Sequence, residues 1–332
     1  MIESEHNGAA CFIGVDLGTT NTRVWLIHGA VAVERLTAEV GVRDTARTGN
    51  NTRLKSTLRS LIIQQQHRAR ERGLHPSFVI GAGMLTSALG LKEIPHISGT
   101  IGIEELRENV VTRIFPDVTD LPFLLIPGVK TGTAGRDPWE IGDTDVIRGE
   151  ETLCVGLMTS RILRANSMLL NLGSHWKAIL IGEDNRIDRC MTNLSGEMIF
   201  AIQTQTILAD SVLSGRPDQL DASWIKHGIA EEQISGLTRA LFCVRLLDLD
   251  ARTNSRQRLS FLVGAFISDT LSYLTSMSML KRHVVICGAT GSACAWAVAL
   301  REHGIDVEDH SEETEQLFIR GLIELSRAFT IV

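Results

Sequence analysis

An aspartate and a short run of small polar residues, set between two apolar segments, could bind phosphate and a metal ion. Residues 12–15 are apolar and lead into Asp16, and a second β-rich segment covers residues 23–27. The turn between them comprises Gly18, Thr19, Thr20 and Asn21. Glycine lets backbone N–H groups approach phosphate oxygens, and threonine and asparagine add further donors. We therefore expect a β-hairpin whose turn binds phosphate, with Asp16 holding Mg²⁺ through water; an ordinary hairpin with a turn-capping aspartate is the alternative.

The same succession of strand, small polar turn and strand returns in the second half of the chain. Residues 167–172 and 177–182 are apolar segments of strand length, and the turn between them comprises Gly173, Ser174 and His175. A further turn follows the apolar segment 283–287 and comprises Gly288, Ala289, Thr290 and Gly291. Two α/β halves that each present a phosphate-type turn are an arrangement that suits ATP. A lone histidine is more often structural than a ligand, so both readings stay open for His175.

A helix is expected to begin near Arg148 and to carry two carboxylates in its first turn. Glu150 and Glu151 stand where the helix dipole favours anions, and they point about 100° apart around the axis. Both could serve only the dipole, or one could take part in catalysis. The Arg148 guanidinium could bind a substrate carboxylate or a transferring phosphoryl group, or it could form a surface or interdomain salt bridge. Arg23 is expected to form an ion pair at the base of the first hairpin.

Further helices must support these turns, and apolar residues at helical spacing mark several of them. We expect helices over residues 104–114 and 231–247, and a long loop over residues 130–146. A last helix, over residues 312–329, could cross back to the first half of the chain.

The composition limits the classes of protein to which the chain can belong. Its 332 residues suffice for one large or two moderate domains, with 44% apolar and 22% charged residues. A net charge of −6 and an aromatic content of 5% argue against binding nucleic acids or anionic membranes. No apolar stretch reaches the roughly 18 residues of a membrane span. The chain is therefore expected to act on a small molecule.

The six cysteines indicate a reducing compartment. They form no CxxC pair, and most lie within apolar segments, so buried free thiols are expected. The acidic amino-terminal segment also lacks the basic start of a signal peptide. Both features predict a cytoplasmic protein.

The three turns, in this order, resemble the two phosphate motifs and the adenosine motif of the actin-like ATPase superfamily. That resemblance implies an α/β fold of two actin-like (ribonuclease H-like) domains that face each other across an ATP cleft. Residues 1–155, joined by a helix over 311–332, would form one domain, and residues 156–310 the other. ATP and Mg²⁺ would be the cofactors. The residues expected to contact ATP are Gly18, Thr19, Thr20, Asn21, Gly173, Ser174, His175, Gly288, Ala289 and Gly291.

Longer segments resemble one family of that superfamily, the 2-dehydro-3-deoxygalactonokinases (2-keto-3-deoxy-galactonate kinases). The resemblance covers roughly residues 11–328, and its most distinctive segment is Arg148-Gly149-Glu150-Glu151-Thr152. The chain departs from the family at Leu17, where tryptophan is usual, and at an insertion before Gly196.

The family resemblance implies ATP-dependent phosphorylation of the terminal hydroxyl of 2-dehydro-3-deoxy-galactonate, in galactonate catabolism. Glu150 stands where related sugar kinases start a helix with a catalytic aspartate, and it is the expected base. Asp145 and Asp143 are the alternatives for that role. Substrate contacts are expected from the loop that carries Met84 and Ser87, and also from Asp145 and Arg148.

Other functions are also compatible with parts of the sequence. Residues 285–291 resemble the glycine fingerprint of NAD(P)-dependent nucleotide-sugar reductases, but Cys294 occupies the third glycine position and too few residues follow for a dinucleotide fold. A kinase of another sugar or sugar acid, or a non-catalytic sugar or nucleotide sensor, would share the actin-like fold. No helix-turn-helix extension is recognised, which argues against a DNA-binding repressor. The sequence leaves open whether the protein forms a homodimer.

Overall fold

The first predicted hairpin forms as β1, Cys11–Leu17, and β2, Thr22–His28, which pair antiparallel. Almost every residue of β1 is buried, because helices cover both faces of the sheet that it joins. The hairpin turn therefore follows a strand, β1, that its buried side chains hold in place.

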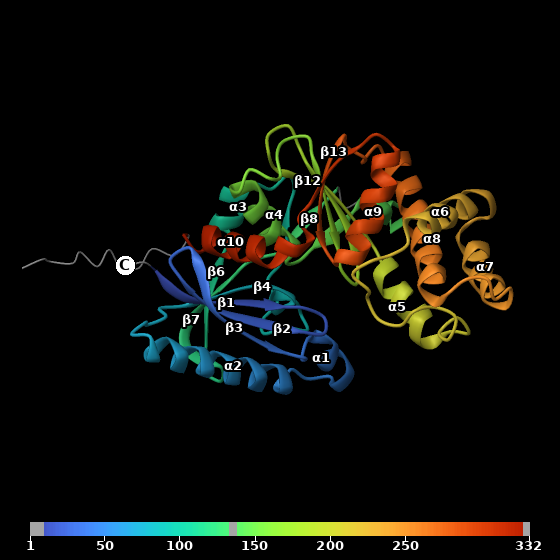
Figure 1. Cartoon of the computed structure of the whole chain (residues 1–332). Helices are drawn as coiled ribbons and strands as arrows, with labels where there is room; N and C mark the ends of the chain where they lie inside the picture. Colours follow the sequence, from blue (N-terminus) through green and yellow to red (C-terminus); the bar gives the residue numbers. More distant parts are fainter. Residues whose placement is uncertain (1–9, 133–137, 328–332) are drawn as a thin grey trace, which may run out of the picture. The chain divides into compact units, whose positions relative to one another are not determined.

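The computed structural model describes residues 10–132 and 138–327, which divide into two compact α/β units (Figure 1). Unit 1 comprises Met1–Arg161 and Glu315–Val332, and unit 2 comprises Ile162–Thr314. The boundary predicted at residues 155 and 156 falls inside a helix, α4, that belongs wholly to unit 1. The predicted α/β fold class is confirmed, and the described residues form two α/β units.

Unit 1 is built on a six-stranded sheet with the order β3-β2-β1-β4-β7-β6 and on a small three-stranded sheet with the order β5-β8-β9. Besides β1 and β2, the large sheet contains β3 Val31–Ala38, β4 Val79–Gly83, β6 Val111–Phe115 and β7 Thr119–Leu125. The small sheet contains β5 Ile97–Ser98, β8 Val129–Thr131 and β9 Asp145–Ile147.

Two helices cover opposite faces of the large sheet, as Figure 1 shows for α2 and α10. Ile13, Val15 and Leu17 of β1 share a buried core with Leu54 and Leu58 of α2. On the other face a Cβ at Gly14 would come within 2.9 Å of Leu322 on α10. The helices of unit 1 are α1 Val42–Thr48, α2 Thr52–Glu71, α3 Ile103–Glu108, α4 Glu150–Thr159 and α10 Thr314–Ser326, with 3₁₀ turns η1 Met84–Thr86 and η2 Pro138–Asp143.

Unit 2 repeats the strand order of unit 1. Its sheet runs β12-β11-β10-β13-β14. In each unit the first three strands pair antiparallel, and parallel strands lie on the other side of the first strand. The strands are β10 Met168–Leu172, β11 Trp176–Ile181, β12 Ile187–Asn193, β13 His283–Gly288 and β14 Asp306–Asp309. The carboxyl ends of β10 and β13 therefore lie side by side, as those of β1 and β4 do in unit 1.

The core of unit 2 surrounds α8, whose residues are buried along most of the helix. Helices α6 and α8 approach closely, because Gly228 of α6 faces the carbonyl of Phe261 and Gly264 of α8 faces the carbonyl of Ile225. The helices are α5 Ser195–Gln205, α6 Ala222–Ser235, α7 Leu237–Leu249, α8 Ser255–Ser276 and α9 Thr290–Glu302, with the 3₁₀ turn η3 Ser311–Glu313.

Three local predictions are wrong. The helix expected over 104–114 ends at Glu108, and residues 111–115 form β6 instead, since they pair with β7. The helix expected over 231–247 is two helices, because Gly236 takes a positive φ of 79° and ends α6. Within the loop expected over 130–146, of which residues 133–137 lie outside the described part, parts of β8 and β9 form a short antiparallel pair. No helix among the described residues is long and apolar enough to cross a membrane.

Candidate active site

Asp16 stands at the end of β1, directly opposite Arg23 in the hairpin register. Arg23 Nη1 lies 2.7 Å from Asp16 Oδ2, which confirms the ion pair expected for Arg23. Burial raises the pKa of Asp16; Arg23 lowers it, and the nearby charges of Glu150 and Glu315 raise it. Among the residues that the structure describes, Asp16 Oδ1 accepts no hydrogen bond. That oxygen is available to a cation or its water shell.

The turn after Asp16 offers unused backbone and side-chain donors. It closes with a hydrogen bond of 2.8 Å from Gly18 N to the Asn21 carbonyl, and the Asn21 side chain donates to Thr20 Oγ1 at 3.0 Å. The N–H groups of Thr19 and Thr20, and the Thr19 hydroxyl, have no partner within residues 10–132 and 138–327. Behind the turn, Arg43 N donates to the Thr19 carbonyl at 2.9 Å and holds it against α1. The turn is thus fixed in shape while its N–H donors remain unused, as phosphate binding requires.

Two glycines bring the start of α4 next to Asp16. Gly83, at the end of β4, has a φ of 73°, and a Cβ there would lie 3.1 Å from Asp16 Oδ1. Gly149, just before α4, has a φ of 112°, and its Cβ would lie 3.2 Å from the Cα of Gly83. Because both glycines adopt conformations that disfavour other residues, the backbones of β1, β4 and α4 meet without side chains between them.

The two glutamates at the start of α4 have different surroundings. Glu150 is half-buried, and its Oε2 accepts a hydrogen bond of 3.1 Å from Arg148 N. Glu151 is fully buried, and both of its carboxylate oxygens accept from Gly149 N, at 2.9 and 2.7 Å. Burial and the charge of Glu150 raise the pKa of Glu151 to about 7, against the lowering effect of backbone N–H groups and Arg148. The two side chains thus accept from different N–H groups, and the charge of Glu150 acts on Asp16.

The Arg148 guanidinium is engaged by the loop that follows β4. Its Nη1 donates to the carbonyl and the hydroxyl of Thr86, both at 2.6 Å, and its Nη2 donates to the Ile94 carbonyl at 3.0 Å. Nη2 also lies 3.0 Å from Nε2 of His96. Burial lowers the pKa of Arg148, and the charges of Glu151 and Glu93 raise it. Both terminal nitrogens are thus occupied by protein groups, an arrangement that favours a positioning role over the predicted contact with substrate.

The residues expected to contact the sugar acid lie around the same loop. Met84 begins η1, and the Ser87 hydroxyl donates to the Met84 carbonyl at 2.8 Å, which closes the turn. Asp145 begins β9, where its Oδ1 accepts from Val146 N at 2.6 Å. Asp143, the other alternative for the base, is exposed at the end of η2. Met84 and Ser87 thus lie in the loop that the hydrogen bonds of Arg148 attach to the start of α4.

The second predicted phosphate turn connects β10 to β11 in unit 2. Gly173 N donates to the His175 carbonyl at 3.4 Å, and the N–H groups of Ser174 and His175 have no partner among the described residues. A Cβ at Gly196, at the start of α5, would come within 2.2 Å of the Gly173 carbonyl. His175 Nε2 lies 3.2 Å from a carboxylate oxygen of Glu197, so a partner from the Ser-Gly-Glu segment orients the imidazole.

A cavity of about 260 Å³ opens beside this turn, entirely within unit 2. Gly173 lines one side and the start of α9 lines another, where Ala289, Thr290, Gly291 and Ser292 stand. Ala289, the residue before α9, makes no capping side-chain bond, so the first N–H groups of the helix remain for a ligand. The rest of the lining is Trp176, Gly196, Ile199, Phe200, Gln203, Gly215, Arg216, Pro217, Asp218, Leu220, Leu259 and Val263.

The third predicted turn meets the second in this cavity. Gly288 has a φ of 101°, and Ala289 N donates to the Leu172 carbonyl at 2.8 Å, so the end of β13 is bound to the end of β10. Gly173, Ala289 and Gly291 line the cavity, whereas Gly288, Ser174 and His175 stand outside its lining.

Sequence reasoning missed the segment that forms another wall of the cavity. Gly215, Arg216, Pro217 and Asp218 belong to no helix or strand, and no periodicity marks them. Arg216 is exposed, and its Nη2 lies 3.5 Å from the Ser174 hydroxyl of the phosphate turn. The Gly-Arg-Pro-Asp sequence indicates a turn, but nothing in it indicates which site that turn would join.

Comparisons with known proteins point to one family over nearly the whole chain. A family model described as 2-keto-3-deoxy-galactonokinase matches residues 16–325. The 2-dehydro-3-deoxygalactonokinase of Escherichia coli (strain K12) is 23% identical over 328 residues, which covers 96% of this chain and 98% of that protein. A crystal structure of a proposed 2-dehydro-3-deoxygalactonokinase from Sinorhizobium meliloti superposes with a TM-score of 0.74 at 22% identity, covering 97% of each chain.

Proposed function

The chain belongs to the 2-keto-3-deoxy-galactonokinase family and is therefore a sugar-acid kinase, and we propose that it phosphorylates the terminal hydroxyl of 2-dehydro-3-deoxy-galactonate. The observation that carries this proposal is the meeting of Asp16, Gly83 and the start of α4, with Glu150 within electrostatic reach of Asp16 and free N–H donors in the turn that follows Asp16. Phosphoryl transfer needs positioning, charge neutralisation and a group that accepts the hydroxyl proton, and this region of unit 1 offers all three.

The nucleotide is ATP with Mg²⁺ in this proposal, and ATP supplies the phosphoryl group that is transferred. The cavity of about 260 Å³ in unit 2 would hold the nucleoside. Gly196 and Gly291 let its walls pack closely together, because added Cβ atoms there would lie only 2.2 and 2.0 Å from neighbouring carbonyls. Its wall at the start of α9 fits the phosphates, since uncapped helix N–H groups bind anions. The free donors at Thr19 and Thr20 and the open Oδ1 of Asp16 would hold phosphate oxygens and hydrated Mg²⁺.

Glu150 is the base in this proposal. Its carboxylate takes the proton from the terminal hydroxyl while the hydroxyl oxygen forms its bond to phosphorus, and the bond between phosphorus and the leaving ADP oxygen breaks. The hydrogen bond from Arg148 N to Glu150 Oε2 keeps the carboxylate at the helix start, where the dipole favours its charged form.

The sugar acid is bound, in this proposal, by the loop that carries Met84 and Ser87, together with Asp145. Arg148 acts by holding that loop, because its guanidinium already donates to Thr86 and Ile94. The cytoplasm is the proposed compartment: the six cysteines form no disulfide, and four of them are buried thiols.

The experiment is coupled ADP release with Mg-ATP on a panel of acceptors. The panel contains 2-dehydro-3-deoxy-galactonate, its gluconate epimer, galactose, glucose and N-acetylglucosamine. We expect turnover on the galactonate and a loss of about 10²- to 10⁴-fold in kcat for Glu150→Gln. Glu108→Gln, an exposed glutamate at the end of α3, is the matched control and should keep full activity.

Three results would change the proposal. Turnover only on another acceptor would leave a kinase with a different substrate. Full activity in Glu150→Gln would move the base to Asp145 or Asp143. Binding of ATP without turnover on any acceptor would favour a sensor instead of an enzyme.

A further inference from the structure

One wall of the unit 2 cavity has no secondary structure of its own. Residues 211–218, here called the strap, run from the end of the loop after α5 to the cavity, where Gly215, Arg216, Pro217 and Asp218 line it. A segment without helix or strand bonds keeps its shape through the side-chain and backbone groups around it that bind its backbone. The strap therefore depends on the groups behind it.

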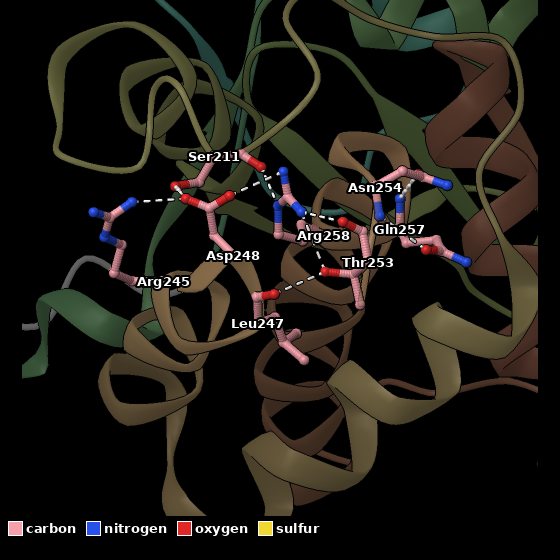
Figure 2. Close-up of polar contacts among 8 residues, drawn as sticks. All are labelled: Ser211, Arg245, Leu247, Asp248, Thr253, Asn254, Gln257 and Arg258. Atoms are coloured by element: carbon pink, nitrogen blue, oxygen red, sulfur yellow. Dashed lines mark hydrogen bonds and ion pairs between the residues drawn. The ribbon is translucent and has the colours of Figure 1, made fainter. Parts of the chain in front are cut away.

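The strap begins at an ion pair whose arginine is buried and whose aspartate is partly exposed, which Figure 2 shows. Arg258, on α8 and 8% exposed, donates from Nε to the Ser211 carbonyl, while its Nη2 lies 3.1 Å from Asp248 Oδ1. The Ser211 hydroxyl donates to Asp248 Oδ2 at 2.8 Å, so Asp248 and Arg258 together bind the hydroxyl and the carbonyl of one strap residue. Arg258 Nη1 donates to the Thr253 carbonyl, which fixes the guanidinium on its other side.

Further bonds continue along the strap to the cavity. Leu213 N donates to the Ser255 carbonyl at 3.0 Å, and Gln203 Nε2 donates to the carbonyls of Leu213 and Gly215 at 2.6 and 2.8 Å. At the far end, the Thr290 hydroxyl of α9 donates to Asp218 Oδ1 at 3.1 Å. The path from Arg258 to the cavity is thus a continuous set of hydrogen bonds from three helices.

Arg216 is the charged residue that these hydrogen bonds hold at the cavity. Its guanidinium forms no ion pair with the residues described in the structure, and its one hydrogen bond is the 3.5 Å contact with Ser174 Oγ. An exposed cation beside a turn with free N–H groups is placed to bind phosphate oxygens. Its position depends on the strap, since Arg216 has no other anchor in the described chain.

We propose that Arg258 and Asp248 are positioning residues for nucleotide binding, which act by fixing the strap so that Arg216 stands beside the phosphate turn. The proposal rests on the proposed binding of ATP in the unit 2 cavity. It assigns no contact between Arg258 and the nucleotide. Loss of the Arg258 bond to Ser211 would release the strap at its first anchor and displace the cavity wall.

The test compares two arginine variants that share the same aspartate. Arg258→Lys keeps the charge but loses the fork that binds Ser211 and Asp248 together. Arg245→Gln is the matched control, because Arg245 Nη1 binds Asp248 Oδ2 at 2.6 Å yet donates to no strap residue. The dissociation constant of Mg-ADP is measured by calorimetry for the wild-type protein and for both variants.

We expect Arg258→Lys to weaken Mg-ADP binding by about tenfold or more, and Arg245→Gln by less than about twofold. Hydrogen exchange should speed up in peptides covering residues 206–220 for Arg258→Lys and stay unchanged elsewhere in unit 2. Asp248→Asn, which keeps the side-chain volume, serves as the second variant if the lysine protein unfolds. The KM for ATP should rise in the same variants, while the KM for the sugar acid stays constant.

The outcomes separate this proposal from the proposed function. Wild-type protein that does not bind Mg-ADP would refute the nucleotide site itself. Wild-type binding with equal affinity in Arg258→Lys and Asp248→Asn would refute the positioning role. A lower melting temperature with an unchanged dissociation constant and unchanged exchange at the strap would show that the pair serves stability alone.

Discussion

Replacement of Glu151 by glutamine should stabilise the protein at neutral pH and lose that advantage in acid. Glu151 is fully buried at the start of α4, beside Glu150, and its pKa rises from 4.5 to about 7. The unfolded chain releases the proton above about pH 4.5, whereas the folded chain keeps it until about pH 7. The contribution of Glu151 to stability is therefore largest below about pH 4.5 and falls as the pH rises through this window.

The size of the effect follows from the shift. At about 1.4 kcal/mol per pKa unit, the wild-type protein should lose about 3 kcal/mol of unfolding free energy between about pH 4.5 and pH 7. Glutamine carries no charge and escapes this loss, but it replaces one acceptor of the Gly149 N–H by an amide donor, which costs about 1 kcal/mol at every pH. The variant should thus be about 2 kcal/mol more stable than wild type above neutral pH, and slightly less stable near pH 4.5.

The assay is urea denaturation followed by circular dichroism at about pH 5, 6, 7 and 8. The quantity of interest is the difference in unfolding free energy between variant and wild type at each pH. Glu108→Gln provides the control, because an exposed glutamate in the same unit should give a difference that stays within about 0.5 kcal/mol. A difference for Glu151→Gln that stays flat from pH 5 to 8 would refute the raised pKa. A difference that falls with pH would mean that the Glu151 charge stabilises the fold.

Three further predictions address the site. Gly149→Ala should lower the free energy of unfolding by about 1–3 kcal/mol, because a φ of 112° strains alanine and the new Cβ would press on the Gly83 Cα. Urea denaturation measures this loss, and an unchanged midpoint would contradict it. Arg148→Lys should raise the KM for the sugar acid about tenfold with little change in the KM for ATP, because the substitution releases the loop at Thr86 and Ile94. Equal changes in the two KM values would argue against a role of Arg148 in holding the loop. Arg216→Gln should weaken Mg-ATP binding about tenfold and leave adenosine binding unchanged in calorimetry, and an equal loss for adenosine would place Arg216 at the nucleoside instead.

The sequence predicts those parts of the fold that depend on residues close together in the chain. The strands β1 and β2 form where apolar segments flank a small polar turn, and the ion pair between Asp16 and Arg23 follows from their register. In the same way α4 begins at Glu150, close to the start predicted near Arg148, and carries the two glutamates in its first turn. Local hydrophobicity, glycine and helix ends were sufficient for these elements.

The parts that the sequence does not predict are decided by distant partners. Residues 111–115 satisfy a helical pattern with the segment before them, but pairing with β7 makes them a strand. Lys177, a charged residue on β11, is only 9% exposed, because β11 is an inner strand of its sheet. The binding of Arg148 to Thr86 and Ile94, and of Arg258 to Ser211, joins residues 47 to 62 positions apart, and no local pattern marks such contacts.

Unit 1 is discontinuous along the chain, and this has a consequence for biosynthesis. The ribosome makes residues 1–161 first, then all of unit 2, and only afterwards the helix α10 that covers one face of the first sheet. That helix packs backbone to backbone on α4, since Gly321 faces the Thr152 carbonyl and Gly156 faces the Leu317 carbonyl. Until α10 has emerged, the nascent first half exposes an apolar surface, whereas the contiguous unit 2 can already fold. Unit 1, which contains Asp16 and Glu150, is therefore completed last, although its synthesis starts first.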